Sequence, residues 1–188
     1  MAFAPPSTNL EKLMKDAFAT NNLQCIYRAV DAGIFQTSTI IDVAQAAEVD
    51  RTTLYRAFRL ENGPSLNTMR RVLRALEFRL VVEPLKEMEA QSNPASARDK
   101  SVRAMSRQFT IAFNSGDSKP LFRVFSQALR AQENVSQFAT RTIVSRESLY
   151  RAFTGPKTPR FGTVLSFLNA LELRFAVQRL PRRARPGA

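Results

Sequence analysis

Two short segments of the chain repeat one combination of arginine, tyrosine and small polar side chains. The combination is Arg-x-x-Leu-Tyr-Arg-Ala-Phe, which begins at residue 51 and again at residue 146. If each segment is a helix with its leucine and alanine buried, the other side chains share the outer face. That face would hold Arg51, Thr52, Thr53, Tyr55 and Arg56 in the first segment, and Arg146, Glu147, Ser148, Tyr150 and Arg151 in the second. Side chains of these types hydrogen-bond the bases and phosphates of double-stranded DNA.

The position of each side chain along the helix predicts its role. The N-terminus of a recognition helix enters the major groove, so we expect Arg51 and Arg146 to reach base edges or a flanking phosphate. Glu147 is suited to accept a hydrogen bond from a cytosine amino group. Arg56 and Arg151 lie one turn later and are expected to bind phosphate and fix the register on DNA. The alternative for these arginines is a solvated charged face without any DNA contact.

The residues before each segment complete a helix-turn-helix pattern. Counting Ile40 as position 1, the buried positions of the motif in the first copy are Val43, Ala44, Ala47, Val49, Leu54 and Ala57. In the second copy they are Phe138, Ala139, Thr142, Val144, Leu149 and Ala152, of which only Thr142 is polar. Two short helices clamped by such residues present the second helix to DNA. Tyr55 and Tyr150 then either contact the DNA backbone through their hydroxyls or pack on the neighbouring helix.

The two copies belong to a longer internal repeat. A shift of 95 positions aligns residues 10–82, the first repeat, with residues 105–177, the second repeat, and 19 of the 73 aligned pairs are identical. Self-similarity at a fixed offset predicts a duplicated structural unit. A polar, proline-containing stretch separates the copies and reads as a linker. The predicted organisation is a first domain at 8–84, a linker at 85–104, a second domain at 105–178 and a basic tail at 179–188.

The apolar spacing within the first repeat predicts five helices and a short closing strand. The first helix is expected to start near Thr8. The second, third and fourth are expected at 22–32, 40–47 and 51–58, with Gly33 ending the second and Asp50 capping the fourth. The fifth carries an apolar face of Leu66, Met69, Val72, Leu73 and Leu76. Strands are expected at 78–82 and 173–177, paired either within the chain or across a homodimer. The fold class is therefore mainly all-α, with a short β-strand closing each domain.

The composition excludes several kinds of chemistry. The chain has no histidine and one cysteine, which excludes histidine acid–base catalysis, histidine metal sites, zinc ribbons and an internal disulfide. We expect Cys25 to be a buried, inert thiol. No nucleophile pair, metal set or glycine-rich phosphate loop is evident, so we expect neither enzymatic activity nor a cofactor. No apolar run approaches the ~18 residues of a membrane span, and the N-terminus lacks signal-peptide features, so we expect a cytoplasmic protein without a membrane partner.

The charge is distributed unevenly along the chain. The formal net charge is +12 and the isoelectric point is near 11.0. Residues 1–90 contain 11 basic and 11 acidic side chains, whereas residues 91–188 contain 17 basic and 5 acidic ones. A polyanionic partner would therefore be bound mainly by the second half, with an affinity that falls steeply with salt. The tail arginines Arg179, Arg182, Arg183 and Arg185 either follow the DNA backbone as an arm or only solubilise the chain.

The repeated string, followed by a proline and a helix ending in Ala-Leu-Glu, resembles the HigA-type addiction-module antidote proteins of the Xre-like helix-turn-helix class. The resemblance covers residues 10–83 and 105–178. It implies a λ-repressor-like helical fold, operator binding, and a toxin or another protein such as a transcription factor as partner. Such antitoxins usually have one domain that dimerises. The family has glycine in the turn between the helices and after the last Ala-Leu, where this chain has Glu48 and Ile143, and Glu77 and Glu172.

Two functions follow from these patterns. The leading one is a sequence-specific transcriptional regulator whose two helix-turn-helix motifs act as a pseudo-dimer on an imperfect palindrome. The other is an interaction module that keeps the fold but neutralises a toxin or a transcriptional activator. The irregular turns and the first half, whose net charge is zero, favour the second function, whereas the basic second half favours the first.

Overall fold

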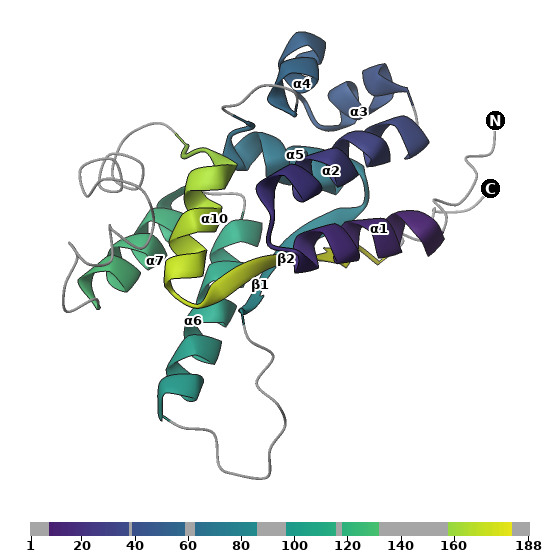
Figure 1. Cartoon of the computed structure of the whole chain (residues 1–188). Coiled ribbons are helices and arrows are strands. Elements are labelled where there is room, and N and C mark those ends of the chain that lie inside the picture. The colour runs from purple at the N-terminus through teal and green to yellow at the C-terminus, as the bar shows by residue number, and fades with distance from the viewer. Residues whose placement is uncertain are drawn as a thin grey trace.

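The computed structural model describes residues 8–37, 39–58, 63–85, 97–115, 118–131 and 158–181, and these residues are mostly helical (Figure 1). The first half contains α1 (Thr8–Ala19), α2 (Leu23–Thr37), α3 (Ile40–Ala46), α4 (Arg51–Ala57), α5 (Leu66–Ala75) and β1 (Phe78–Pro84). The second half contains α6 (Ala97–Asn114), α7 (Ser118–Arg130), α10 (Phe161–Ala170) and β2 (Leu173–Arg179). The prediction of a mainly helical fold with short strands is confirmed.

Polar side chains at the start of each helix explain several of these boundaries. Asn22 Oδ1 accepts hydrogen bonds from the backbone of Gln24 and Cys25, at 2.9 and 3.1 Å. Thr39 forms a capping box with Asp42. Asp50 caps α4 by accepting the Thr52 and Thr53 amides, and Ser65 caps α5 by accepting the Thr68 amide. Each cap satisfies backbone N–H groups that have no partner within the helix.

The two strands pair within the chain as an antiparallel two-stranded sheet. The register pairs Val81 with Ala176, the residue 95 positions later, and therefore centres the sheet on equivalent residues. Ser65 and Arg160, also 95 positions apart, form a second antiparallel bridge. Around that bridge the Leu66 amide donates to the Pro159 carbonyl and the Phe161 amide to the Pro64 carbonyl, both at 2.9 Å. These reciprocal contacts describe an approximate two-fold axis between the described parts of the two repeats.

The first helix of each half packs on the strand of the other half. α6 lies against β1, and α1 lies against β2 (Figure 1). Ser106 and Thr110 of α6 hydrogen-bond the Val82 backbone, at 2.6 and 2.8 Å, and the Asn114 amide donates to the Leu80 carbonyl at 2.8 Å. These side chains satisfy backbone groups on the outer edge of β1. As a result, the buried apolar residues of both halves form one continuous core.

Tyr27 and Arg160 join the two halves close to the bridge. The Tyr27 ring lies 6.0 Å from Phe58 and 6.3 Å from Phe161, centroid to centroid. Burial raises the pKa of the Tyr27 hydroxyl to about 12. A Cβ atom added at Gly63, whose φ is +56°, would lie 2.1 Å from that hydroxyl oxygen. The Arg160 guanidinium donates to the Gly63 carbonyl at 2.8 Å.

Two predictions about α2 are wrong. Gly33 does not end the helix, which continues to Thr37. The glycine instead lies in the core, where an added Cβ would approach the Leu10 and Leu76 side chains at 3.2 and 3.3 Å. Cys25 is exposed rather than buried, because Ile26, its neighbour on the helix, faces the core.

α6 begins at Ala97, inside the segment predicted as a linker.

Candidate nucleic-acid interface

α3, the following turn and α4 are the segment in which the sequence predicts a helix-turn-helix. The predicted clamp residues Val43, Ala44, Ala47, Leu54 and Ala57 are buried, and Val49 is partly buried against the same core. The Val49 amide donates to the Ala44 carbonyl at 2.9 Å, which closes the turn. Asp50 caps α4 as predicted. The pattern read from the sequence therefore matches the packing of these residues.

The turn keeps a left-handed backbone although it lacks glycine. Glu48 has a φ of 50°, a conformation that costs a non-glycine residue about 1–2 kcal/mol. Arg71 of α5 donates to the Glu48 carbonyl at 3.0 Å and lies 3.6 Å from its carboxylate. The tertiary contact from α5 thus supports a turn that the sequence alone disfavours. Glu77 and Glu172 also have positive φ values, of 65° and 59°.

The outer face of α4 presents the predicted side chains to solvent. Arg51, Thr52, Thr53 and Arg56 are exposed. Tyr55 is 39% exposed, so its ring covers part of the surface without being buried. The Asp50 carboxylate accepts the Thr52 and Thr53 amides at 2.8 and 3.2 Å, which occupies the free backbone donors of the helix start. A polyanion at this face would therefore be bound by side chains rather than by the backbone.

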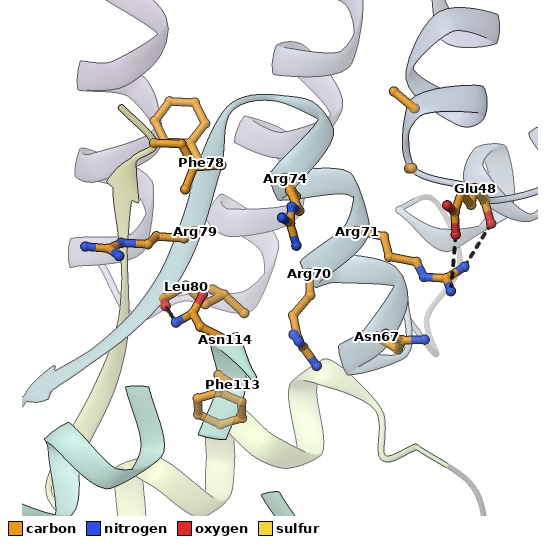
Figure 2. A pocket seen from close by; sticks show the side chains of 13 residues that line it. Glu48, Asn67, Arg70, Arg71, Arg74, Phe78, Arg79, Leu80, Phe113 and Asn114 are labelled. Atoms are coloured by element: carbon orange, nitrogen blue, oxygen red, sulfur yellow. Dashed lines mark hydrogen bonds and ion pairs between the residues drawn. The ribbon is translucent and has the colours of Figure 1, made fainter. Parts of the chain in front are cut away.

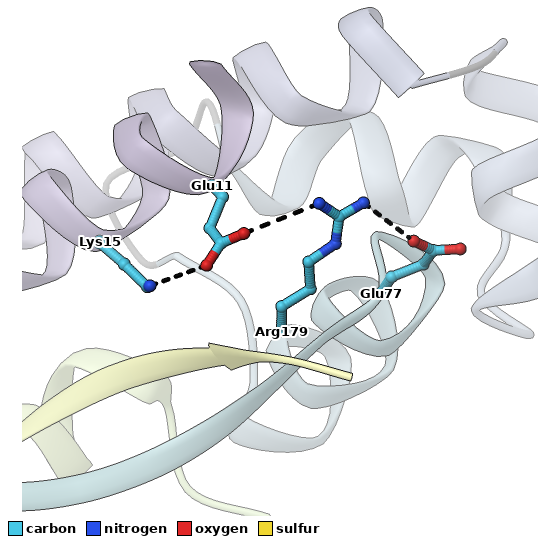
Figure 3. Close-up of polar contacts among 4 residues, drawn as sticks. All are labelled: Glu11, Lys15, Glu77 and Arg179. Atoms are coloured by element: carbon cyan, nitrogen blue, oxygen red, sulfur yellow. Dashed lines mark hydrogen bonds and ion pairs between the residues drawn. The ribbon is translucent and has the colours of Figure 1, made fainter. Parts of the chain in front are cut away.

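The corresponding face of the second repeat lies outside the described residues. This applies to Arg146, Glu147, Ser148, Tyr150 and Arg151, and to their predicted clamp and turn at 138–152. The tail arginines at 182, 183 and 185 also lie outside them. Arg179 was predicted to belong to the basic tail, but it is the last residue of β2. Its guanidinium lies 3.7 Å from the Glu11 carboxylate and 3.5 Å from that of Glu77 (Figure 3).

A second basic feature, which sequence reasoning missed, lies behind the turn. Arg70, Arg71 and Arg74 of α5 and Arg79 of β1 line a recess of about 540 Å³, the arginine pocket. Figure 2 shows Arg70 and Arg74 projecting from α5 into the same space, whereas Arg71 turns toward Glu48. Burial lowers the pKa of Arg70, and the charges of Arg74 and Arg71 lower it further. The spacing of three arginines within five residues was the available signal, but the recess forms only when β1 and α6 approach α5.

No group of side chains suited to hold a metal ion occurs among the described residues. None of the described helices is both long and apolar enough to cross a membrane.

Comparison with known proteins gives matches to parts of the chain. Residues 95–179 match a family model described as a probable addiction module antidote protein. An uncharacterized protein of Haemophilus influenzae is 47% identical over 45 residues, which are 24% of this chain. The aligned segment covers 46% of that relative, so the chain matches about half of its length. No solved structure matches the chain. The second repeat is therefore similar to antitoxins of addiction modules.

Proposed function

We propose that the chain is an antitoxin-like, sequence-specific DNA-binding regulator whose two helix-turn-helix motifs act as a covalent pseudo-dimer. The observation that carries the proposal is the clamped α3–turn–α4 unit with Arg51 and Arg56 exposed on its outer face. Arg51, at the helix start, is assigned to base edges or a flanking phosphate, and Arg56 to phosphate. The family match of the second repeat supports the antitoxin class.

The approximate two-fold axis supports binding to a palindrome. Regulators of this type present two recognition helices to half-sites about one helical turn of DNA apart, ~34 Å. The reciprocal bridge at Ser65 and Arg160 and the pairing of β1 with β2 relate the two repeats within one chain. The outer faces differ, because Thr52 and Thr53 correspond to Glu147 and Ser148. The proposed operator is therefore an imperfect palindrome.

Selection of DNA retained by the full chain, followed by anisotropy titration, tests the proposal. Arg51→Ala should lower the specific affinity by about 1–3 kcal/mol if the side chain contacts a base. Arg56→Ala should weaken all sequences similarly and reduce the salt dependence of binding. Arg28→Ala is the matched control, because Arg28 is equally exposed but lies on α2. Unchanged DNA binding by the Arg51 and Arg56 variants would show that α4 is not part of the DNA interface.

A protein partner is a second candidate function. Phe35 and Ile41, near the junction of α2 and α3, are 53% and 56% exposed, and exposed aromatic and aliphatic side chains favour protein contacts. The description of the matching family as an antidote points in the same direction. Co-expression with the product of a neighbouring gene tests this function, with Phe35→Ser plus Ile41→Ser as the variant. Loss of a co-purified toxin without loss of DNA binding would support it.

A further inference from the structure

We propose that the arginine pocket binds a small anion carrying two or more phosphate groups. The pocket is separate from the outer face of α4 and contains no residue assigned above to DNA. The inference therefore does not depend on the regulator function.

Two of the pocket's arginines, Arg70 and Arg74, have no acidic partner among the described residues. Arg70 is only partly exposed, and its neighbours on the same face of α5 include Arg74, one turn later. Among the described residues, neither Arg70 nor Arg74 has an ion pair or a side-chain hydrogen bond. Arg71 has the exposed Glu48 carboxylate at 3.6 Å. Partly desolvated like charges are unfavourable, and an anion between them would relieve the repulsion.

The shape and donors of the pocket suit a compact phosphate compound. A volume of about 540 Å³ lies within the range of small-molecule sites. Guanidinium groups bind phosphate oxygens through two parallel hydrogen bonds. Leu80, Phe113 and Leu180 bound the recess from β1, α6 and the end of β2, so both halves of the chain contribute walls. A ligand inside the recess can reach both Arg70 and Arg74, whereas a DNA duplex would reach only the opening.

The three arginines of α5 occur in the first repeat alone. The positions equivalent to Arg70, Arg71 and Arg74 are Leu165, Ser166 and Asn169. Leu165 lies on α10 and is buried, and none of the three side chains carries a charge. One binding site per chain is therefore expected.

Calorimetric titration of the full chain with pyrophosphate tests the proposal. We expect one site per chain, and an affinity weakened roughly tenfold or more in the R70Q/R74Q variant. Binding should also raise the melting temperature of the wild type, because the ligand binds only the folded chain. The R28Q variant is the control and should bind like the wild type. A second variant, R70L/R74N, copies the residues of the second repeat and should lose binding in the same way if R70Q/R74Q fails to fold.

Three results would overturn the proposal. The first is the absence of both binding heat and a change in melting temperature on addition of pyrophosphate. The second is binding at several sites per chain, with equal losses in R28Q and R70Q/R74Q, which would indicate a diffuse basic surface. The third is displacement of pyrophosphate by a short duplex, together with a lower salt dependence of DNA binding in R70Q/R74Q, which would assign the pocket to backbone phosphates. Only this last result bears on the DNA-binding function, and it would leave that function intact.

Discussion

The two repeats bury equivalent positions with different side chains. Five core positions are aliphatic or methionine in the first repeat and phenylalanine in the second, namely Met14/Phe109, Val30/Phe125, Leu66/Phe161, Val72/Phe167 and Leu80/Phe175. The phenylalanine rings contact one another, with centroids 5.2 Å apart for Phe109 and Phe125 and 5.0 Å for Phe125 and Phe167. α5 and α10, like β1 and β2, nevertheless have bounds 95 positions apart. The arrangement of elements thus depends on which positions are buried more than on which side chains fill them.

The surfaces differ as well as the cores. The first repeat carries three arginines on α5 where α10 has Leu165, Ser166 and Asn169. α6 hydrogen-bonds the backbone of β1 through Ser106, Thr110 and Asn114. The equivalent residues of α1 are Glu11, Lys15 and Ala19. In the described parts of the two repeats, equivalent helices and strands therefore carry different surface residues, which fits the proposal that only one repeat carries the arginines of an anion site.

The largest expected effect tests the aromatic core. Phe125→Ala should lower the free energy of unfolding by about 3–5 kcal/mol, because it leaves a cavity among Phe109, Phe113 and Phe167. Val30→Ala, at the equivalent position of the first repeat, removes fewer atoms and should cost less. Urea unfolding of both variants measures the difference. Equal losses would show that the two cores are energetically alike despite their composition.

The next prediction concerns Gly63, whose positive φ is not shared by the equivalent residue of the second repeat. Gly63→Ala should lower stability by about 1–3 kcal/mol, because φ is +56° and the new Cβ would clash with the Tyr27 ring. The equivalent residue, Thr158, is exposed and has no positive φ, so Thr158→Ala is the control and should change little. Adding Tyr27→Phe to Gly63→Ala should restore part of the loss. Thermal unfolding would contradict the comparison if both alanine variants melted alike.

The side-chain contacts of α6 with β1 give a smaller effect. Ser106→Ala should cost about 1–2 kcal/mol, since it leaves the buried Val82 carbonyl without the 2.6 Å hydrogen bond from this hydroxyl. Amide hydrogen exchange should then be faster than in the wild type in β1, but unchanged in α4. Arg103→Ala, on the exposed side of the same helix, is the matched control. An unchanged exchange rate in β1 would mean that the Ser106 hydroxyl does not help to hold α6 against this strand.

Glu11, the residue of the first repeat equivalent to Ser106, should have the smallest effect. A hydrogen bond from Lys15, together with the charges of Lys15 and Arg179, holds the pKa of this carboxyl below its usual value of 4.5. Its contribution is therefore present above pH 4.5 and is lost as the pH falls through the lowered value. Glu11→Gln should flatten that part of the stability profile, and added salt should reduce the difference. A profile identical to that of the wild type would show that the carboxylate contributes nothing.

Local features of the fold could be predicted from the sequence, whereas contacts between distant segments could not. The caps of α4 and the clamp around Ala44 follow from patterns a few residues long. The close packing of Gly33, inside α2, against Leu10 and Leu76 brings together residues that are far apart in the chain. Pairing of the strands within the chain, rather than across a homodimer, was one of two alternatives and needed the structure. The arginine pocket could not be predicted because it forms between several elements that are far apart in the sequence.

The pairing of β1 with β2 also determines how the molecule responds to dilution. In a dimer of two chains the subunits separate once their concentration falls below the dissociation constant. Here both strands belong to one chain, and the segment between them keeps their effective concentration constant. The distance between the two halves should therefore be the same at nanomolar as at micromolar protein. A cell containing only a few copies of this chain would still hold every one of them in the assembled form.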